Sequence, residues 1–142
     1  MKICKFGVAG LLPLLLAGAD NTSARDNLIG TWEEDSAKSP AVWVVEVKGD
    51  AFHIAQSQGD QKRVEVTCTP TGAECMGTDA GKKVKFVMYY NGPTLVQIET
   101  AGTNITRRRF TVRGEPNMMD LEETKLSADG KPEMMHLKRK AS

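Results

Sequence analysis

Two histidines, His53 and His136, are the side chains best suited to acid–base chemistry at neutral pH. Nucleophilic catalysis also needs a nucleophile and an orienting group, and no Gly-x-Ser-x-Gly elbow or comparable motif accompanies either histidine. Neighbouring carboxylates occur at residues 33–35 and 122–123, but adjacent residues of a strand point to opposite faces, so they do not form a working pair. We therefore predict a protein that is not an enzyme, with no catalytic residue and no cofactor.

Soft metal ligands gather near the C-terminus. They are Met118, Met119, Met134, Met135 and His136. Thioether and imidazole ligands together suit copper(I). Methionine also fills irregular cores, and strand alternation lets only one member of each Met–Met pair face inward. We predict core packing and no metal site, and copper(I) binding is the alternative.

An arginine run at residues 107–109 places Arg108 on the same strand face as Phe110, which predicts that Arg108 points inward. An interior arginine needs an anionic partner. In a barrel with room for a guest, this partner is a ligand carboxylate or phosphate; otherwise an internal acid such as Glu99 serves. With Arg108 as polar anchor, the predicted ligand-facing wall consists of Phe86, Met88, Tyr90 and Phe110. Packing of the core is the competing role for this wall.

The N-terminus has the pattern of a secretory signal peptide: Lys2 and Lys5, then an apolar stretch over residues 6–17 that is too short to span a bilayer. The small-x-small pattern of a cleavage site ends at residue 19 and, less well, at residue 24. We expect a signal peptide at residues 1–19, with cleavage after residue 24 or an uncleaved anchor as alternatives. The mature protein is then exported, periplasmic or secreted, without stable membrane insertion.

Export makes a disulfide between Cys68 and Cys75 the expected state of this pair, because Cys4 leaves with the signal. A redox or metal pair is the competing interpretation, but the spacing is not Cys-x-x-Cys and further ligands are missing.

The whole chain has 19 basic and 18 acidic residues, so the mature charge is close to zero. This balance argues against a nucleic-acid partner, which needs a strongly basic face.

Apolar residues recur at every second position in short runs, which predicts strands rather than helices. The predicted strands cover residues 28–34, 41–48, 51–58, 63–68, 83–90, 94–100, 104–113, 118–125 and 131–140. Residues 69–74 are predicted to be a turn. Strands that follow one another as hairpins predict an all-β fold. We expect a small up-and-down antiparallel β-barrel of about eight strands, because closing the sheet into a barrel removes its exposed edge strands. It forms a single domain over residues 25–142, and a two-sheet sandwich is the structural alternative.

The segment Asn-Leu-Ile-Gly-Thr-Trp at residues 27–32 resembles the Gly-x-Trp first strand of lipocalins and related barrels. Residues 30–39, and the turn Ser-Ala-Asp-Gly-Lys at residues 127–131, are similar to small secreted bacterial lipocalin-like proteins. Arg139 matches in position the basic residue that lipocalins stack on the first-strand tryptophan. The chain is shorter than ordinary lipocalins and has no Thr-Asp-Tyr motif in its middle.

This resemblance implies a lipocalin-like barrel in which Gly30, Trp32 and Arg139 close one end. A guanidinium over an indole contributes about 1 kcal/mol of cation–π attraction. The alternative is that Trp32 is ordinary core and Arg139 a solvated residue at the chain's end.

The predicted function is that of a non-catalytic exported barrel that binds a small apolar or amphipathic ligand. The alternative is a barrel filled by its own side chains, a structural or protein-interaction module of the cell envelope such as an adaptor or inhibitor. Its protein partner is not specified by the sequence. The space inside the barrel distinguishes the two functions.

Overall fold

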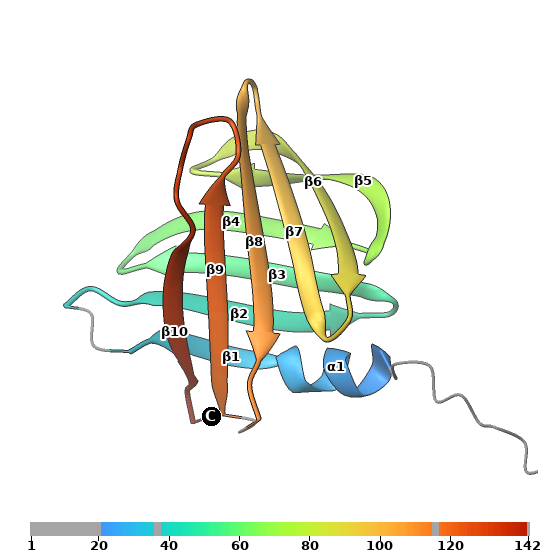
Figure 1. Ribbon diagram of the computed structural model, residues 1–142, viewed down its shortest axis with the longest axis vertical. Coiled ribbons are helices and arrows are strands. Elements are labelled where there is room, and N and C mark those ends of the chain that lie inside the picture. The colour runs from blue at the N-terminus through green and yellow to red at the C-terminus, as the bar shows by residue number, and fades with distance from the viewer. Residues whose placement is uncertain (1–20, 36–37, 115–116, 142) are drawn as a thin grey trace, which may run out of the picture.

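The computed structural model describes residues 21–35, 38–114 and 117–141, so the predicted signal segment 1–19 lies outside the described residues. These residues form a helix and ten strands: α1 (Asn21–Leu28), β1 (Gly30–Glu34), β2 (Ala41–Lys48), β3 (Ala51–Gln58), β4 (Gln61–Cys68), β5 (Thr71–Asp79), β6 (Lys82–Asn91), β7 (Thr94–Ala101), β8 (Asn104–Val112), β9 (Met118–Lys125) and β10 (Glu133–Arg139). Each strand pairs antiparallel with the next, and β1 pairs with β10 to close the barrel (Figure 1). The predicted up-and-down closed barrel is confirmed.

Two elements differ from the sequence prediction. The turn expected at residues 69–74 instead contains the start of β5, which pairs with β6 from Thr71 onward. β5 adds a tenth strand to the nine predicted ranges, so the barrel expected to have about eight strands has ten. The strand expected from residue 28 begins only at Gly30, because residues 21–28 form α1. Figure 1 shows α1 lying across the end of the barrel at which β8 finishes.

Alternation of buried and outward-facing residues fills the barrel from nine of its ten strands, and β5 contributes no buried side chain. On β6, Val84, Phe86 and Met88 are buried while Lys83 and Lys85 face outward, as period-2 geometry requires. The largest enclosed side chains are Trp32, Trp43, Phe52, Phe86 and Phe110, all between 0% and 1% exposed. An empty cavity wide enough for water would leave accessible area on such walls, so these side chains fill the centre of the barrel themselves.

The ladder between β4 and β5 is short. Only three residue pairs join these strands, from Val64–Asp79 to Val66–Gly77, as many as join β1 to β10. Beyond Gly77 the predicted disulfide is confirmed: Cys68 and Cys75 are bonded, with their Cα atoms 5.7 Å apart. The disulfide therefore holds the two strands together where their ladder ends.

The end of the barrel next to α1 is covered by the tryptophan of β1. The Trp32 indole donates to the carbonyl of Leu28 at 2.9 Å, and the Arg139 guanidinium lies 4.3 Å from the ring centroid. Arg139 also donates to the carbonyls of Asn27, at 2.8 Å, and Ile29. Gly30 has φ +146°, and a Cβ there would collide with the Arg139 guanidinium, which explains the glycine.

Candidate functional site

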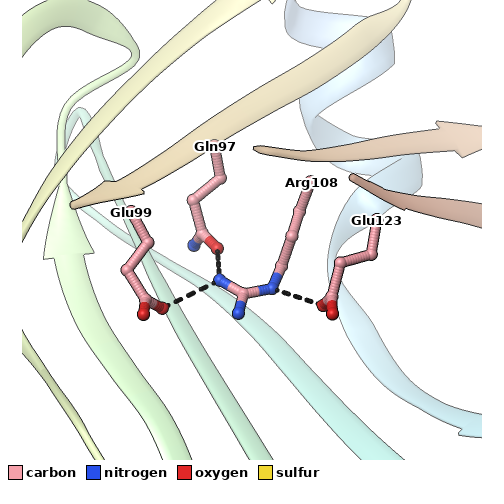
Figure 2. A network of polar contacts seen from close by, with 4 residues as sticks. All are labelled: Gln97, Glu99, Arg108 and Glu123. Atoms are coloured by element: carbon pink, nitrogen blue, oxygen red, sulfur yellow. Dashed lines mark hydrogen bonds and ion pairs between the residues drawn. The ribbon is translucent and has the colours of Figure 1, made fainter. Parts of the chain in front are cut away.

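Arg108 of β8 points into the barrel and is only 5% exposed. Gln97 of β7 and Glu123 of β9 are its cross-strand partners, so the register of three strands assembles this cluster. Arg108 donates from Nη1 to Gln97 Oε1 and Glu99 Oε1, and from Nε to Glu123 Oε2, each at 3.0 Å (Figure 2). The charge of Arg108 is thus matched within the protein, and Glu99 is the internal acid that the sequence offered as the alternative to a ligand.

Glu99 is the titrating member of this cluster. The pKa of its carboxyl is raised from 4.5 to about 7, chiefly by burial and also by a side-chain hydrogen bond with Asp79, while Arg108 opposes the rise. Counting Arg108, Glu99 and Glu123 alone, the cluster is neutral when Glu99 is protonated and carries one negative charge when it is ionised. Such a cluster does not favour an added carboxylate ligand.

Two buried donors lie close to the Arg108 cluster without a partner. Trp43 packs edge-on against Phe110, with centroids 5.3 Å apart, and the Arg108 guanidinium lies 5.8 Å from the Trp43 ring. Within the described part of the chain, neither Trp43 Nε1 nor Gln97 Nε2 has a hydrogen-bond acceptor. Unpaired buried donors cost free energy, so this region is polar without being fully satisfied.

The predicted ligand wall separates into a buried part and an accessible part. Phe86, Met88 and Phe110 do line the interior, but each is 0% exposed and packed in the core. Tyr90, at the end of β6, is only partly buried and stacks edge-on to Phe52 with centroids 6.2 Å apart. Of the predicted wall, Tyr90 is therefore the residue with open space beside it.

That space is a pocket of about 230 Å³ at the α1 end, which we call the end pocket. Its lining residues come from α1, the β2–β3 hairpin, the β4–β5 turn and the end of β6, and are Arg25, Val47, Asp50, Ala51, Phe52, Pro70 and Tyr90. Burial raises the pKa of the Tyr90 hydroxyl, Arg25 lowers it, and Asp26 raises it. Among the described residues that hydroxyl is buried without a hydrogen-bond partner, so one residue of the pocket's lining carries an unsatisfied polar group.

The sequence predicted Tyr90 as a ligand-facing residue, but it did not predict Arg25 and Pro70 as pocket residues. Arg25 follows a predicted cleavage site, and Pro70 lies in the turn predicted at residues 69–74. A helix predicted before β1 would have indicated this pocket. The pocket lies between α1, the β2–β3 hairpin, the β4–β5 turn and the end of β6.

The two histidines lie on the outside of the barrel, each next to acid. His53 has Glu46 3.4 Å from Nδ1 and Glu65 3.3 Å from Nε2, and His136 Nδ1 lies 2.8 Å from Asp120. Among residues 21–35, 38–114 and 117–141, no three His, Cys, Asp or Glu side chains are grouped so as to hold a metal. No helix in this part of the chain is long and apolar enough to cross a membrane.

Comparison with solved structures places this geometry in a known fold. A secretory abundant heat soluble protein from Ramazzottius varieornatus superposes with a TM-score of 0.68 at 13% identity, over 80% of this chain and 96% of that one. A Schistosoma mansoni fatty acid binding protein in complex with arachidonic acid gives 0.67 at 16%, over 83% and 99%. Fatty-acid-binding protein 1 of Echinococcus granulosus gives 0.67 at 12%, over 82% and 99%.

The chain has a calycin-like fold. At these identities the likeness concerns the fold alone. No family model matches the sequence, and no curated protein matches it. Function therefore has to be argued from the pockets and side chains of this barrel.

Proposed function

We propose that this protein is an exported, non-catalytic calycin-like barrel that binds a small amphipathic molecule in the end pocket. The observation that carries the proposal is the end pocket itself: Val47 and Phe52 form an apolar wall beside the unpaired Tyr90 hydroxyl and the Arg25 guanidinium. Pockets of this kind, apolar with a few convergent polar groups, are the usual form of small-molecule sites.

The size of the end pocket limits the ligand. Its 230 Å³ equals the liquid volume of roughly eight water molecules. A short alkyl chain or a single ring fits this space, whereas a long acyl chain needs the centre of the barrel, which Phe86, Met88 and Phe110 occupy. The ligand's polar group would hydrogen-bond to Tyr90 and meet the charges of Arg25 and Asp50 at the pocket.

Export is supported by the Cys68–Cys75 disulfide, because such bonds persist in oxidising compartments. Cleavage after residue 19 would leave α1 whole, whereas cleavage after residue 24 would remove its first half and leave Arg25 as the new terminus. We therefore favour Asp20 as the first residue of the mature chain. N-terminal sequencing of protein recovered from the exporting host tests this, and a start at Arg25 would contradict it.

Binding is tested by calorimetric titration with octanol, octanoate and octylamine, three probes that share one chain and differ in charge. Tyr90→Phe removes only the hydroxyl and should weaken the best-bound probe about fivefold, the value of one net hydrogen bond. Tyr89→Phe is the matched control, because Tyr89 faces outward on the same strand. No saturable binding of any probe, or equal affinities for the two variants, would overturn the proposal.

A second function is favoured by the filled centre of the barrel. A barrel packed with its own aromatic side chains is a rigid scaffold, as expected of a structural or protein-interaction module of the envelope. Failure of all three probes to bind would favour this module over the binding protein.

A further inference from the structure

We propose that the ligand of the end pocket is a small zwitterion with an apolar tail, of the type of an α-amino acid with an alkyl side chain. Arg25 would bind its carboxylate, and Asp50 would bind its ammonium group. This inference rests on the proposed function and adds to it the charges that the ligand carries. It is supported by two opposite charges that line the same pocket and leave each other unmatched.

Asp50 lies at the tip of the β2–β3 hairpin. The ladder between these strands ends with the pair Lys48–Ala51, and the turn is made by Gly49, with φ +64°, and Asp50. The Asp50 side chain is exposed, and no cation or hydrogen-bond donor in the described part of the chain pairs with its carboxylate. An unpaired carboxylate in the lining of a pocket attracts a cationic group of the ligand.

Arg25 lies in the last turn of α1 and lines the same pocket. Its Nε donates to Asp26 Oδ1 at 3.4 Å, and because the Arg25 side chain is 41% exposed, this ion pair is a weak surface contact. Both Nη atoms of Arg25, the forked end of the guanidinium, have no acceptor among the described residues. A guanidinium fork binds a carboxylate through two parallel hydrogen bonds. Arg25 can therefore bind a carboxylate and keep its contact with Asp26.

Arg25 and Asp50 do not neutralise each other. Within residues 21–35, 38–114 and 117–141, no ion pair joins these two side chains, so their charged atoms lie more than 4.0 Å apart. A ligand with a carboxylate alone would be attracted by Arg25 and repelled by Asp50, and an amine would meet the reverse. A molecule that carries both charges, separated by a few bonds, matches both sides of the pocket.

The rest of the lining is apolar and accommodates an alkyl tail. Val47 and Phe52 are cross-strand partners in the β2–β3 hairpin, and the Phe52 ring packs edge-on against Tyr90. Ala51 and Pro70 complete this apolar lining. The volume of about 230 Å³, that of roughly eight water molecules, holds the two charged groups and a chain of a few carbons.

The test is calorimetric titration of the full chain with three probes that share one alkyl chain. Norleucine carries both charges, hexanoate lacks the ammonium group, and pentylamine lacks the carboxylate. A hydrogen bond to a charged group changes affinity by about tenfold or more. We therefore expect norleucine to bind at least tenfold more tightly than hexanoate or pentylamine.

Two variants assign each charge of the ligand to its residue. Arg25→Gln should weaken the binding of norleucine and hexanoate about tenfold without weakening that of pentylamine, and Asp50→Asn should weaken norleucine and pentylamine about tenfold without weakening hexanoate. Asp60→Asn is the matched control, because Gly59 and Asp60 form the same kind of turn at the opposite end of β3. Arg63→Gln, at an exposed arginine of β4, is the control for Arg25→Gln.

This crossed pattern separates direct contact from a general effect on the fold, because a distorted pocket would lose affinity for all three probes together. Norleucine binding no more tightly than hexanoate and pentylamine, or equal losses for all probes in both variants, would overturn the zwitterion. The octyl probes distinguish that failure from failure of the proposed function. If they bind while norleucine gains nothing from its second charge, the end pocket remains a ligand site and only its zwitterionic ligand is refuted.

Discussion

Glu99→Gln is the substitution that most directly tests the account of the barrel's polar cluster. The folded chain raises the pKa of Glu99 from 4.5 to about 7, chiefly because the carboxyl is buried. The folded state therefore binds this proton more tightly than the unfolded state does. The resulting stability is greatest where Glu99 is protonated, and it is lost as pH rises through the window from 4.5 to about 7.

The magnitude follows from the size of this pKa shift. Each pKa unit corresponds to 1.36 kcal/mol, so between pH 5 and pH 8 titration of Glu99 lowers the free energy of unfolding by about 2 to 3 kcal/mol. Glutamine does not titrate, and its amide oxygen still accepts from Arg108. We expect the variant to lack this part of the pH dependence.

The assay is urea unfolding followed by the fluorescence of the buried Trp32 and Trp43 at several pH values between 5 and 8. Groups away from this cluster contribute equally to parent and variant, so the difference between the two curves isolates Glu99. Glu74→Gln is the control, because that side chain is 66% exposed. Identical pH dependence in Glu99→Gln and the parent would refute the reasoning.

Three further predictions concern the barrel's closure. Replacing Cys68 and Cys75 by serine should lower the free energy of unfolding by about 2 kcal/mol in urea titrations, because the bond closes a short loop; an unchanged midpoint would contradict this. Gly77→Ala should cost about 1 to 3 kcal/mol, since a Cβ would lie 2.7 Å from Phe86, while Gly114→Ala, with open space around it, should cost under about 0.5 kcal/mol. Arg139→Gln should cost about 2 kcal/mol through loss of the Trp32 contact and the hydrogen bonds to α1 and its following turn, and a near-zero effect in thermal unfolding would show that this end closes without it.

Strands with clear alternation were predictable from the sequence, and β6 is the best example. β5 was not, because small and polar residues occupy both of its faces and Gly77 leaves room for the Phe86 ring. Missing it also hid the gap between β4 and β5. α1 was missed because its residues join directly to a convincing strand, and a short polar helix has no strong apolar periodicity.

The orientation of Arg108 followed from alternation, but its partners did not. Gln97 and Glu123 lie beside Arg108 because of the register between β7, β8 and β9. The lengths of the connecting turns set this register. Whether the interior is open or filled depends on side-chain packing, which period-2 patterns do not determine. The end pocket is formed jointly by α1, the β2–β3 hairpin, the β4–β5 turn and the end of β6. The alternation pattern of a single strand therefore could not predict it.

The measurement that tests the central claim most directly is the position of a bound octyl probe, read from intermolecular NOEs. The account predicts contacts from the best-bound probe to the rings of Phe52 and Tyr90 at the end pocket. It predicts no contacts to the methyls of Met88 and Met119, which are 0% exposed in the filled centre. Strong NOEs to those two methyls would show a ligand inside the barrel and contradict the account.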